Sequence, residues 1–118
     1  MTYEQIAAMV AGIGLPNAHD HFEEGEAVDP PFICFMYPGR DDFHADGVNY
    51  AKITELRIEL YTDNKDFELE AAVEAAMESA DIGYSKLGPT YINTERMYVT
   101  TYETSVMLDS SEEESGGG

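Results

Sequence analysis

The sequence predicts an α+β domain in which two helices pack on a mostly antiparallel sheet of about four to five strands. Two segments, near residues 2–13 and 66–77, place apolar residues at helical spacing. Runs with strand periodicity lie between and after them, separated by proline and glycine. The predicted order is α-β-β-β-α-β-β, with a long hairpin loop between the second and third strands. Because the strands come in runs, this order favours an α+β domain.

The first helix is expected to begin at Thr2, whose side chain can cap the exposed N–H groups of the first turn. Gln5 stands three positions later and completes a capping box. Gly14 is a left-handed stop, and Pro16 prevents the helix from continuing. The apolar stripe of this helix is formed by Ile6, Met9, Val10 and Ile13.

Three strands are expected before the second helix. Residues 17–22 form the first. Residues 32–37, FICFMY, are apolar at odd and even positions alike, which indicates a strand covered on both faces. Residues 50–62 form a longer strand with one apolar and one polar face. Its apolar face is formed by Leu56, Ile58 and Leu60.

The second helix is expected to follow Asp63 or Asp66, either of which can cap it, and to end near Gly83. Its apolar side is formed by Phe67, Leu69, Val73, Ala76 and Met77, and its outer side by Glu68, Glu70, Glu74 and Glu78.

Two strands complete the predicted domain. A short one at 84–87 is ended by Gly88-Pro89, and the last spans 95–108. The last strand places Tyr98, Tyr102, Val106 and Leu108 on one alternation. Residues 1–108 therefore form a single domain, and the charged, glycine-rich residues 109–118 are expected to be a disordered tail.

Composition excludes several classes of function. The chain has 24 Asp and Glu but only 6 Lys and Arg, which gives a formal charge of -18. This negative charge opposes binding to nucleic acid and to anionic membranes. No apolar run approaches the ~20 residues of a membrane span. Disorder would also fit this charge, but 43% of the residues are hydrophobic, which supplies material for a core.

The chemistry-bearing residues do not form a complete motif, so we expect no catalytic residues, no metal and no cofactor. His19 and His21 would share one side of a strand, with Cys34 or His44 as a third metal ligand. Neither zinc-finger spacing nor a helical His-Glu-x-x-His accompanies them. Cys34 lies in an apolar run, where burial raises the pKa of a thiol and makes it inert.

Residues 40–49 are polar and predicted to form a loop, and together with Tyr50 they make up the candidate interface loop. It is about ten residues long, whereas a simple hairpin needs about two to five. The ring of Phe43 stands among carboxylates, and such a ring either folds back on its own domain or docks into a partner. The candidate interface residues are Arg40, Asp41, Asp42, Phe43, Asp46 and Tyr50.

Three segments carry a resemblance to a known family. They are PPFICF at 30–35, YPGRDDFHADGVNY at 37–50 and ELYTDNKDFELEA at 59–71. With the opening MTYEQIAAMV, they make residues 1–108 resemble the tail-completion or tail-terminator proteins of tailed phages and prophages of Gram-positive bacteria. That family offers no catalytic residues to carry over.

The resemblance implies a structural virion protein, made in the host cytoplasm and placed at the head–tail interface. Its copies would form a ring, of about six subunits in this class, that caps the tail tube, stops its growth and enables head–tail joining. The implied partners are other copies of the chain, the major tail tube protein and a head-completion or connector protein. DNA would pass through the ring without specific binding, because a negative lumen repels phosphate.

Three alternatives remain open. One is a head-completion or connector protein at the same interface. Another is a small acidic protein that blocks a host protein as a nucleic-acid mimic. The third is a metal-dependent enzyme that uses His19, His21 and Cys34.

Overall fold

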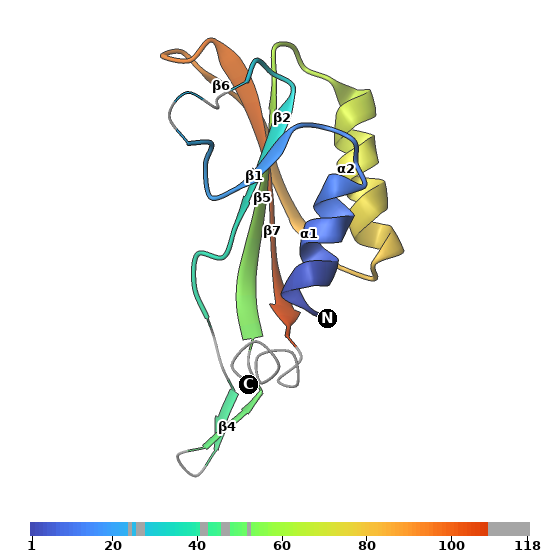
Figure 1. Cartoon of the computed structure of the whole chain (residues 1–118), viewed down its shortest axis with the longest axis vertical. Helices are drawn as coiled ribbons and strands as arrows, with labels where there is room; N and C mark the ends of the chain where they lie inside the picture. The colour runs from blue at the N-terminus through green and yellow to red at the C-terminus, as the bar shows by residue number, and fades with distance from the viewer. Residues whose placement is uncertain (24, 26–27, 41–42, 46–47, 52, 109–118) are drawn as a thin grey trace.

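The computed structural model describes residues 1–23, 25, 28–40, 43–45, 48–51 and 53–108, and of 43–45 and 48–51 the backbone alone (Figure 1). The elements of the main domain follow the predicted order, so the α+β class is confirmed. They are α1 Tyr3–Ala11, β1 Asn17–His19, β2 Phe32–Met36, β5 Ile53–Thr62, α2 Phe67–Ser79, β6 Ser85–Ile92 and β7 Met97–Met107. A separate pair, β3 Phe43–Ala45 and β4 Val48–Ala51, lies between β2 and β5.

The main sheet has five strands in the order β1-β2-β5-β7-β6. All neighbours are antiparallel except β1 and β2, which are parallel. The long strands β5 and β7 are paired along their length, from Ile53 with Met107 to Thr62 with Tyr98. The short strand β1 and the strand β6 are consequently the two edges of this sheet.

Both helices cover the same face of the sheet (Figure 1). The capping box at Thr2 is confirmed, because Thr2 Oγ1 accepts from the Gln5 N–H at 3.0 Å and Gln5 Oε1 accepts from the Thr2 N–H at 2.9 Å. Asp66 caps α2 by accepting from the Leu69 N–H at 3.1 Å. These local caps fix where each helix begins, and tertiary packing supplies the remaining stability.

The core lies between the helices and the sheet. Side chains on β5 alternate, with Leu56, Ile58 and Leu60 buried and the residues between them more exposed. Around this row cluster Ile6, Val10, Ile33, Phe35, Val73, Met77, Ile82, Tyr102, Val106 and Leu108. The predicted apolar faces of α1, β5 and β7 are therefore confirmed in the main, although Met9, Ile13 and Tyr98 are only partly buried and Ile13 follows the end of α1.

Two residues of α2 do not lie where the helical pattern placed them. Phe67, assigned to the apolar side, is 71% exposed. Glu70, assigned to the outer side, is 3% exposed. Phe67 is the first residue of the helix, beyond the stripe that packs on the sheet, and Glu70 is turned inward because a lysine from β6 reaches it.

Strand ends also differ from expectation. β1 stops at His19 rather than at residue 22, because Asp20 adopts a left-handed conformation with φ 68. β7 begins at Met97 rather than at residue 95, after Arg96 turns the chain with φ 54. In both cases a single residue with positive φ breaks the extended backbone.

The prediction that Gly88-Pro89 ends the strand after α2 was wrong. β6 continues to Ile92 through a register shift between Leu87 and Thr90. Because β6 is an edge strand, Pro89 can lack its N–H without breaking the sheet. A Cβ on Gly88 would meet Thr90 N and Val99 O at 2.8 Å, so the irregularity requires glycine.

The expectation of a loop at 40–49 was wrong in part. Phe43–Ala45 and Val48–Ala51 form an antiparallel ribbon with a register shift between Phe43 and His44. These short segments lack the clear apolar alternation that would identify a strand. Asp46-Gly47, a turn signal in sequence, stands between them. The expected disordered tail, 109–118, lies outside the described residues.

We predict that Ile58→Ala will lower the free energy of unfolding by about 2–5 kcal/mol, because it opens a cavity in the core. The side chain of Ile58 is 0% exposed in the middle of the buried β5 row. Met107→Ala is the control, since Met107 is 60% exposed and its loss should change stability by about 0.5 kcal/mol or less. Denaturant melts of both variants measure the difference, and equal midpoints would contradict the packing.

Candidate functional site

The residues of the metal-dependent alternative do not converge. In the β1–β2 register Ala18 pairs with Cys34 and His19 with Phe35, so His19 and Cys34 point to opposite faces of the sheet. The His19 ring stacks on Phe35 with centroids 5.3 Å apart. His21 Nε2 lies 3.9 Å from Glu23 Oε1 at the surface. Among the described residues no group of three or more His, Cys, Asp or Glu could hold a metal ion.

Cys34 is buried, as the sequence indicated. It faces the side of the sheet away from the helices, because its neighbours Ile33 and Phe35 belong to the helix-side core. Burial raises the pKa of the Cys34 thiol, and the nearby charge of Glu59 raises it further. A thiol with a raised pKa carries little thiolate at neutral pH, so this position is a poor nucleophile.

The densest polar cluster joins α2 to the sheet through Lys86 of β6. Its Nζ lies 2.7 Å from Glu70 Oε1 and 2.8 Å from Glu74 Oε2. The Tyr102 hydroxyl donates to Glu74 Oε2 at 2.8 Å, and Lys86 Nζ lies 5.9 Å from the centroid of the Tyr102 ring. The ammonium is therefore surrounded by two carboxylates and the face of an aromatic ring.

The pKa shifts in this cluster move away from neutrality. Hydrogen bonding to Lys86 holds the pKa of Glu74 below its usual value, and hydrogen bonding to Glu70 and Glu74 raises that of Lys86. Burial, and then the bond to Glu74, raises the pKa of Tyr102. A general acid or base needs a pKa near the working pH. The cluster is consequently suited to holding α2 on the sheet rather than to proton transfer.

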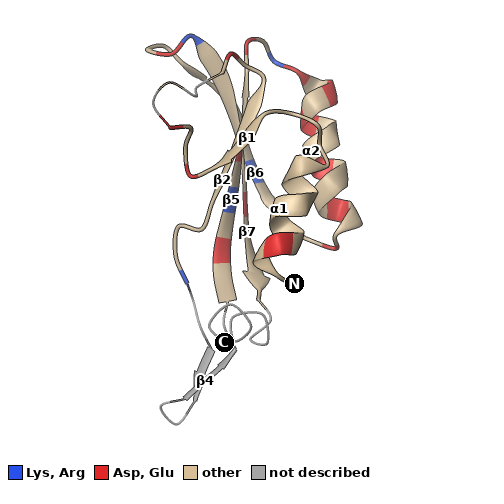
Figure 2. Cartoon of the chain, in the orientation of Figure 1, with Lys and Arg blue, Asp and Glu red and all other residues tan. Residues whose placement is uncertain are grey.

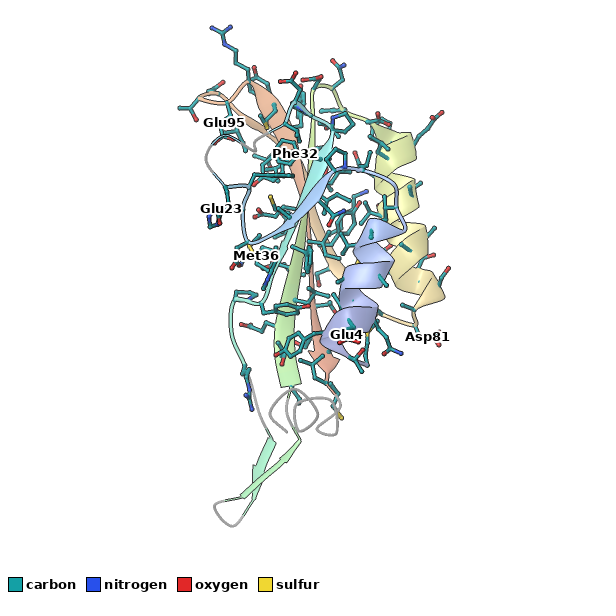
Figure 3. The ribbon with its side chains drawn as sticks, in the orientation of Figure 1. Glu4, Glu23, Phe32, Met36, Asp81 and Glu95 are labelled. Atoms are coloured by element: carbon teal, nitrogen blue, oxygen red, sulfur yellow. The ribbon has the colours of Figure 1, made fainter. Side chains whose placement is uncertain are left out.

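The sheet face away from the helices carries an aromatic row and two polar links. Phe32 stacks on Tyr61 with centroids 4.8 Å apart, and Phe22 meets Phe32 edge-on at 5.4 Å. The Tyr61 hydroxyl donates to Glu59 Oε1 at 2.8 Å. Figure 3 shows Phe32 and Met36 on this side of the molecule. The face is partly apolar and has no helix over it (Figure 1).

A second link on this face is the pair Arg57–Glu103, which spans β5 and β7. The guanidinium donates to Glu103 Oε2 from Nη2 at 3.1 Å and from Nε at 3.3 Å. Both side chains are over a third exposed, so the pair adds little stability. It does, however, neutralise one of the chain's few basic groups within its own sheet.

An open recess of about 550 Å³ lies between α1 and the β1–β2 edge. Its rings meet at steep angles, with Tyr37 edge-on to Tyr3 at 5.0 Å and to His19 at 5.3 Å. The lining residues are Tyr3, Glu4, Ala7, His19, Phe35 and Tyr37. Sequence reasoning missed this recess, because its rings come from three separate segments that only the fold brings together.

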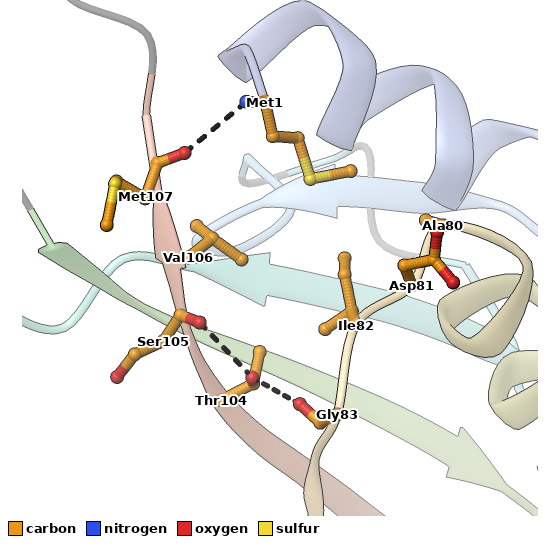
Figure 4. A pocket seen from close by; sticks show the side chains of 9 residues that line it. All are labelled: Met1, Ala80, Asp81, Ile82, Gly83, Thr104, Ser105, Val106 and Met107. Carbon is orange, nitrogen blue, oxygen red and sulfur yellow. Dashed lines mark hydrogen bonds between the residues drawn. The ribbon is translucent and has the colours of Figure 1, made fainter.

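A smaller hollow lies where the ends of the domain meet (Figure 4). The Met1 ammonium donates to the Met107 carbonyl at 3.3 Å, and the Thr104 hydroxyl donates to the Gly83 carbonyl. Ile82 and Val106 line it with apolar atoms. Nothing in this hollow brings together groups of complementary reactivity, and its contacts hold the start of α1 against the end of β7.

The candidate interface loop is described only in part. Arg40 is exposed, and its backbone forms an isolated bridge with Thr54. The backbones of Phe43 and Tyr50 lie in β3 and β4. Asp41, Asp42 and Asp46 lie outside the described residues, as do the side chains of Phe43 and Tyr50. The β3–β4 ribbon extends beyond the end of β5, at the bottom of Figure 1.

Comparison with known proteins gives no assignment: no protein-family model matches the chain, and no curated protein is significantly similar to it. In the part of the chain that the structure describes, no helix is long and apolar enough to cross a membrane. The candidate functional surfaces of the chain are therefore the recess, the uncovered sheet face and the projecting ribbon.

We predict that Lys86→Met will destabilise the domain by about 1–3 kcal/mol at pH 7. Loss of one partner from a fully buried pair costs about 3–5 kcal/mol, and partial exposure of Lys86 reduces that figure. The lowered pKa of Glu74 adds stability above its ordinary value of 4.5, and this is lost as the pH falls through the folded value. The difference from wild type should therefore shrink in acid.

The measurement is denaturant unfolding of wild type and variant at pH 7 and at about pH 3.5, below the usual pKa of a carboxylate. Lys65→Met is the matched control, since Lys65 is exposed and forms no ion pair with any described residue. A Lys86→Met penalty that is equal at both pH values would show that packing of the lysine stem, not its charge, stabilises the cluster.

Proposed function

We propose that this chain is a structural subunit that assembles with copies of itself into a ring at the head–tail interface of a phage virion. In the ring it acts as a tail terminator, ending polymerisation of the tail tube and enabling head–tail joining. The proposal extends the sequence resemblance described above. Its structural support comes from features that suit assembly rather than chemistry.

The observation that carries the proposal is the β3–β4 ribbon. It pairs with no other described strand and extends past the end of the main sheet (Figure 1). A two-stranded ribbon on its own is marginally stable in water, so it gains most when it packs against another surface. Because it extends away from its own core, a neighbouring subunit or the tail tube is the surface that it can reach.

The uncovered face of the sheet supports the same proposal. Helices cover one face, and the other presents the aromatic row that contains Phe32 and Tyr61 (Figure 3). Aromatic residues are enriched where protein subunits meet. A subunit with a projecting ribbon and a partly apolar sheet face has the surfaces needed to contact more than one neighbour.

The charge distribution fits a channel through which DNA passes. Figure 2 shows acidic residues along α2 and one in the first turn of α1, while Lys and Arg are few. A formal charge of -18 on each copy would give a strongly negative assembly. Such an assembly repels phosphate and offers no basic surface on which DNA could stall.

We predict that purified protein will form a discrete ring with a central opening, seen by negative-stain electron microscopy and weighed by light scattering. A connector protein would also form a ring, so a phage test is needed to separate the two. Phage lacking the gene should give heads separate from tails of abnormal length if the chain is a terminator. Tails of normal length that fail to join heads would favour the connector role.

The ribbon can be tested in the same phage by combining Phe43→Ala with Asp42→Ala. We expect folded protein by circular dichroism, but separate heads and tails or tails of abnormal length, because an aromatic anchor and its polar rim are lost together. Normal virions at normal titre would remove the ribbon from the interface. A monomer that binds a host protein would instead support the acidic-mimic alternative.

A further inference from the structure

The recess between α1 and the β1–β2 edge combines aromatic rings with one carboxylate. Tyr37 lies at 88° to Tyr3 and at 72° to His19, so the walls present ring faces in several directions. Glu4 lines the recess and forms no ion pair with any described residue. Ring faces attract cations, and a nearby carboxylate adds a charge-assisted hydrogen bond. The chemistry therefore fits a basic side chain.

The charge of the chain restricts how two copies can meet. With -18 on each copy, contact between like-charged surfaces is unfavourable unless a basic group lies at the junction. Arg57 and Lys86 are already paired with carboxylates of their own chain. Arg40 also has an interaction, and Lys52 lies outside the described residues.

Of the described basic residues, two exposed ones remain, Lys65 and Arg96, and neither forms an ion pair with another described residue. Lys65 belongs to the turn between β5 and α2 and Arg96 to the turn between β6 and β7, and both turns lie at the end of the domain opposite the β3–β4 ribbon (Figure 1). Arg96 stands on the β6–β7 turn, which its N–H closes by donating to the Ile92 carbonyl at 2.8 Å. A guanidinium can stack on a ring and bind a carboxylate at the same time, whereas an ammonium lacks the planar fork.

We propose that the recess receives Arg96 of a second copy of this chain, with its guanidinium against the rings of Tyr3 and Tyr37 and its N–H groups on Glu4. The inference rests on the proposed ring and specifies one of its contacts. β1 and β6 are opposite edges of the sheet, so each subunit has the recess at one edge and the arginine at the other. Such a contact is head-to-tail, which is the geometry that closes into a ring.

The test is charge reversal in the full chain, with assembly followed by light scattering across a concentration series. Glu4→Arg and Arg96→Glu should each weaken self-association at least about tenfold, because both replace the charge pair with like charges and Arg96→Glu also removes the cation–π contact. The double variant Glu4→Arg/Arg96→Glu restores an opposite-charge pair and should recover most of the assembly. Circular dichroism confirms that each variant is folded.

Mixing the two single variants gives a sharper result. In a ring where they alternate, Arg96 of the Glu4→Arg variant meets the unaltered Glu4 of the Arg96→Glu variant. At the next junction, the glutamate introduced by Arg96→Glu meets the arginine introduced by Glu4→Arg. Every junction then has opposite charges, so an equimolar mixture should assemble more strongly than either component alone. A mixture that assembles no better than its components would contradict the contact.

Matched controls separate this contact from general charge effects. Glu68 is the second residue of α2, as Glu4 is of α1, so Glu68→Arg reverses a charge at an equivalent helical position. Lys65→Glu reverses an exposed cation in the turn between β5 and α2 that forms no ion pair with a described residue. Both controls should leave the assembly within about twofold of wild type, since neither residue is part of the contact.

The outcomes distinguish the two levels of the proposal. If wild type forms rings and neither Glu4→Arg nor Arg96→Glu weakens them, the recess contact is overturned and the ring function stands. If the controls weaken assembly as much as the recess variants do, net charge explains the result and the contact is likewise overturned. If wild type stays monomeric at high concentration, both the contact and the ring are overturned.

Discussion

The structure depends on β5, the central strand of the sheet, and on the strict alternation of its side chains. Leu56, Ile58 and Leu60 are buried beneath the helices, and their burial fixes the register of β5 against both neighbours. A slip of one residue would turn Arg57 and Glu59 into the core, where uncompensated charges are costly. The hydrophobic effect on this one strand therefore determines which faces of β2 and β7 meet the helices, and which remain uncovered.

The Lys86 cluster adds a second constraint at the edge of the sheet. The net stability that ion pairs of this kind add is small, because the cost of removing their charges from water offsets their attraction. Glu70 and Glu74 lie one turn apart on α2, and Lys86 lies beside both. The cluster thus selects one rotation of α2, which explains why Glu70 points inward while Phe67, at the start of the same helix, remains exposed.

Features that depend on neighbouring residues in sequence could be predicted, and those that depend on distant segments could not. The Thr2 capping box and the β5 alternation are local patterns, and both are confirmed. The inward position of Glu70 depends on a lysine from a different element, β6, which no helical pattern contains. The persistence of β6 through Pro89 depends on its place at the edge, which follows from strand order. The recess needs Tyr3, His19 and Tyr37 together, and no periodicity links them.

The two sheet edges also bear on how copies of the chain can join. Subunits often associate by pairing exposed edge strands, but β1 has three residues and β6 is interrupted at Gly88-Pro89. An edge strand that is short, or one that is irregular and contains proline, resists such pairing. Continuous backbone pairing between copies along β1 or β6 is therefore disfavoured, so contacts at these edges depend on side chains. In a chain with 24 acidic and 6 basic residues, each exposed basic side chain then has a strong influence on which surfaces meet.

Because exposed charge pairs are screened by salt, assembly through such contacts would weaken as ionic strength rises, whereas assembly through burial of the uncovered aromatic row would not. The balance between these two responses would show which surface contributes most to the proposed assembly.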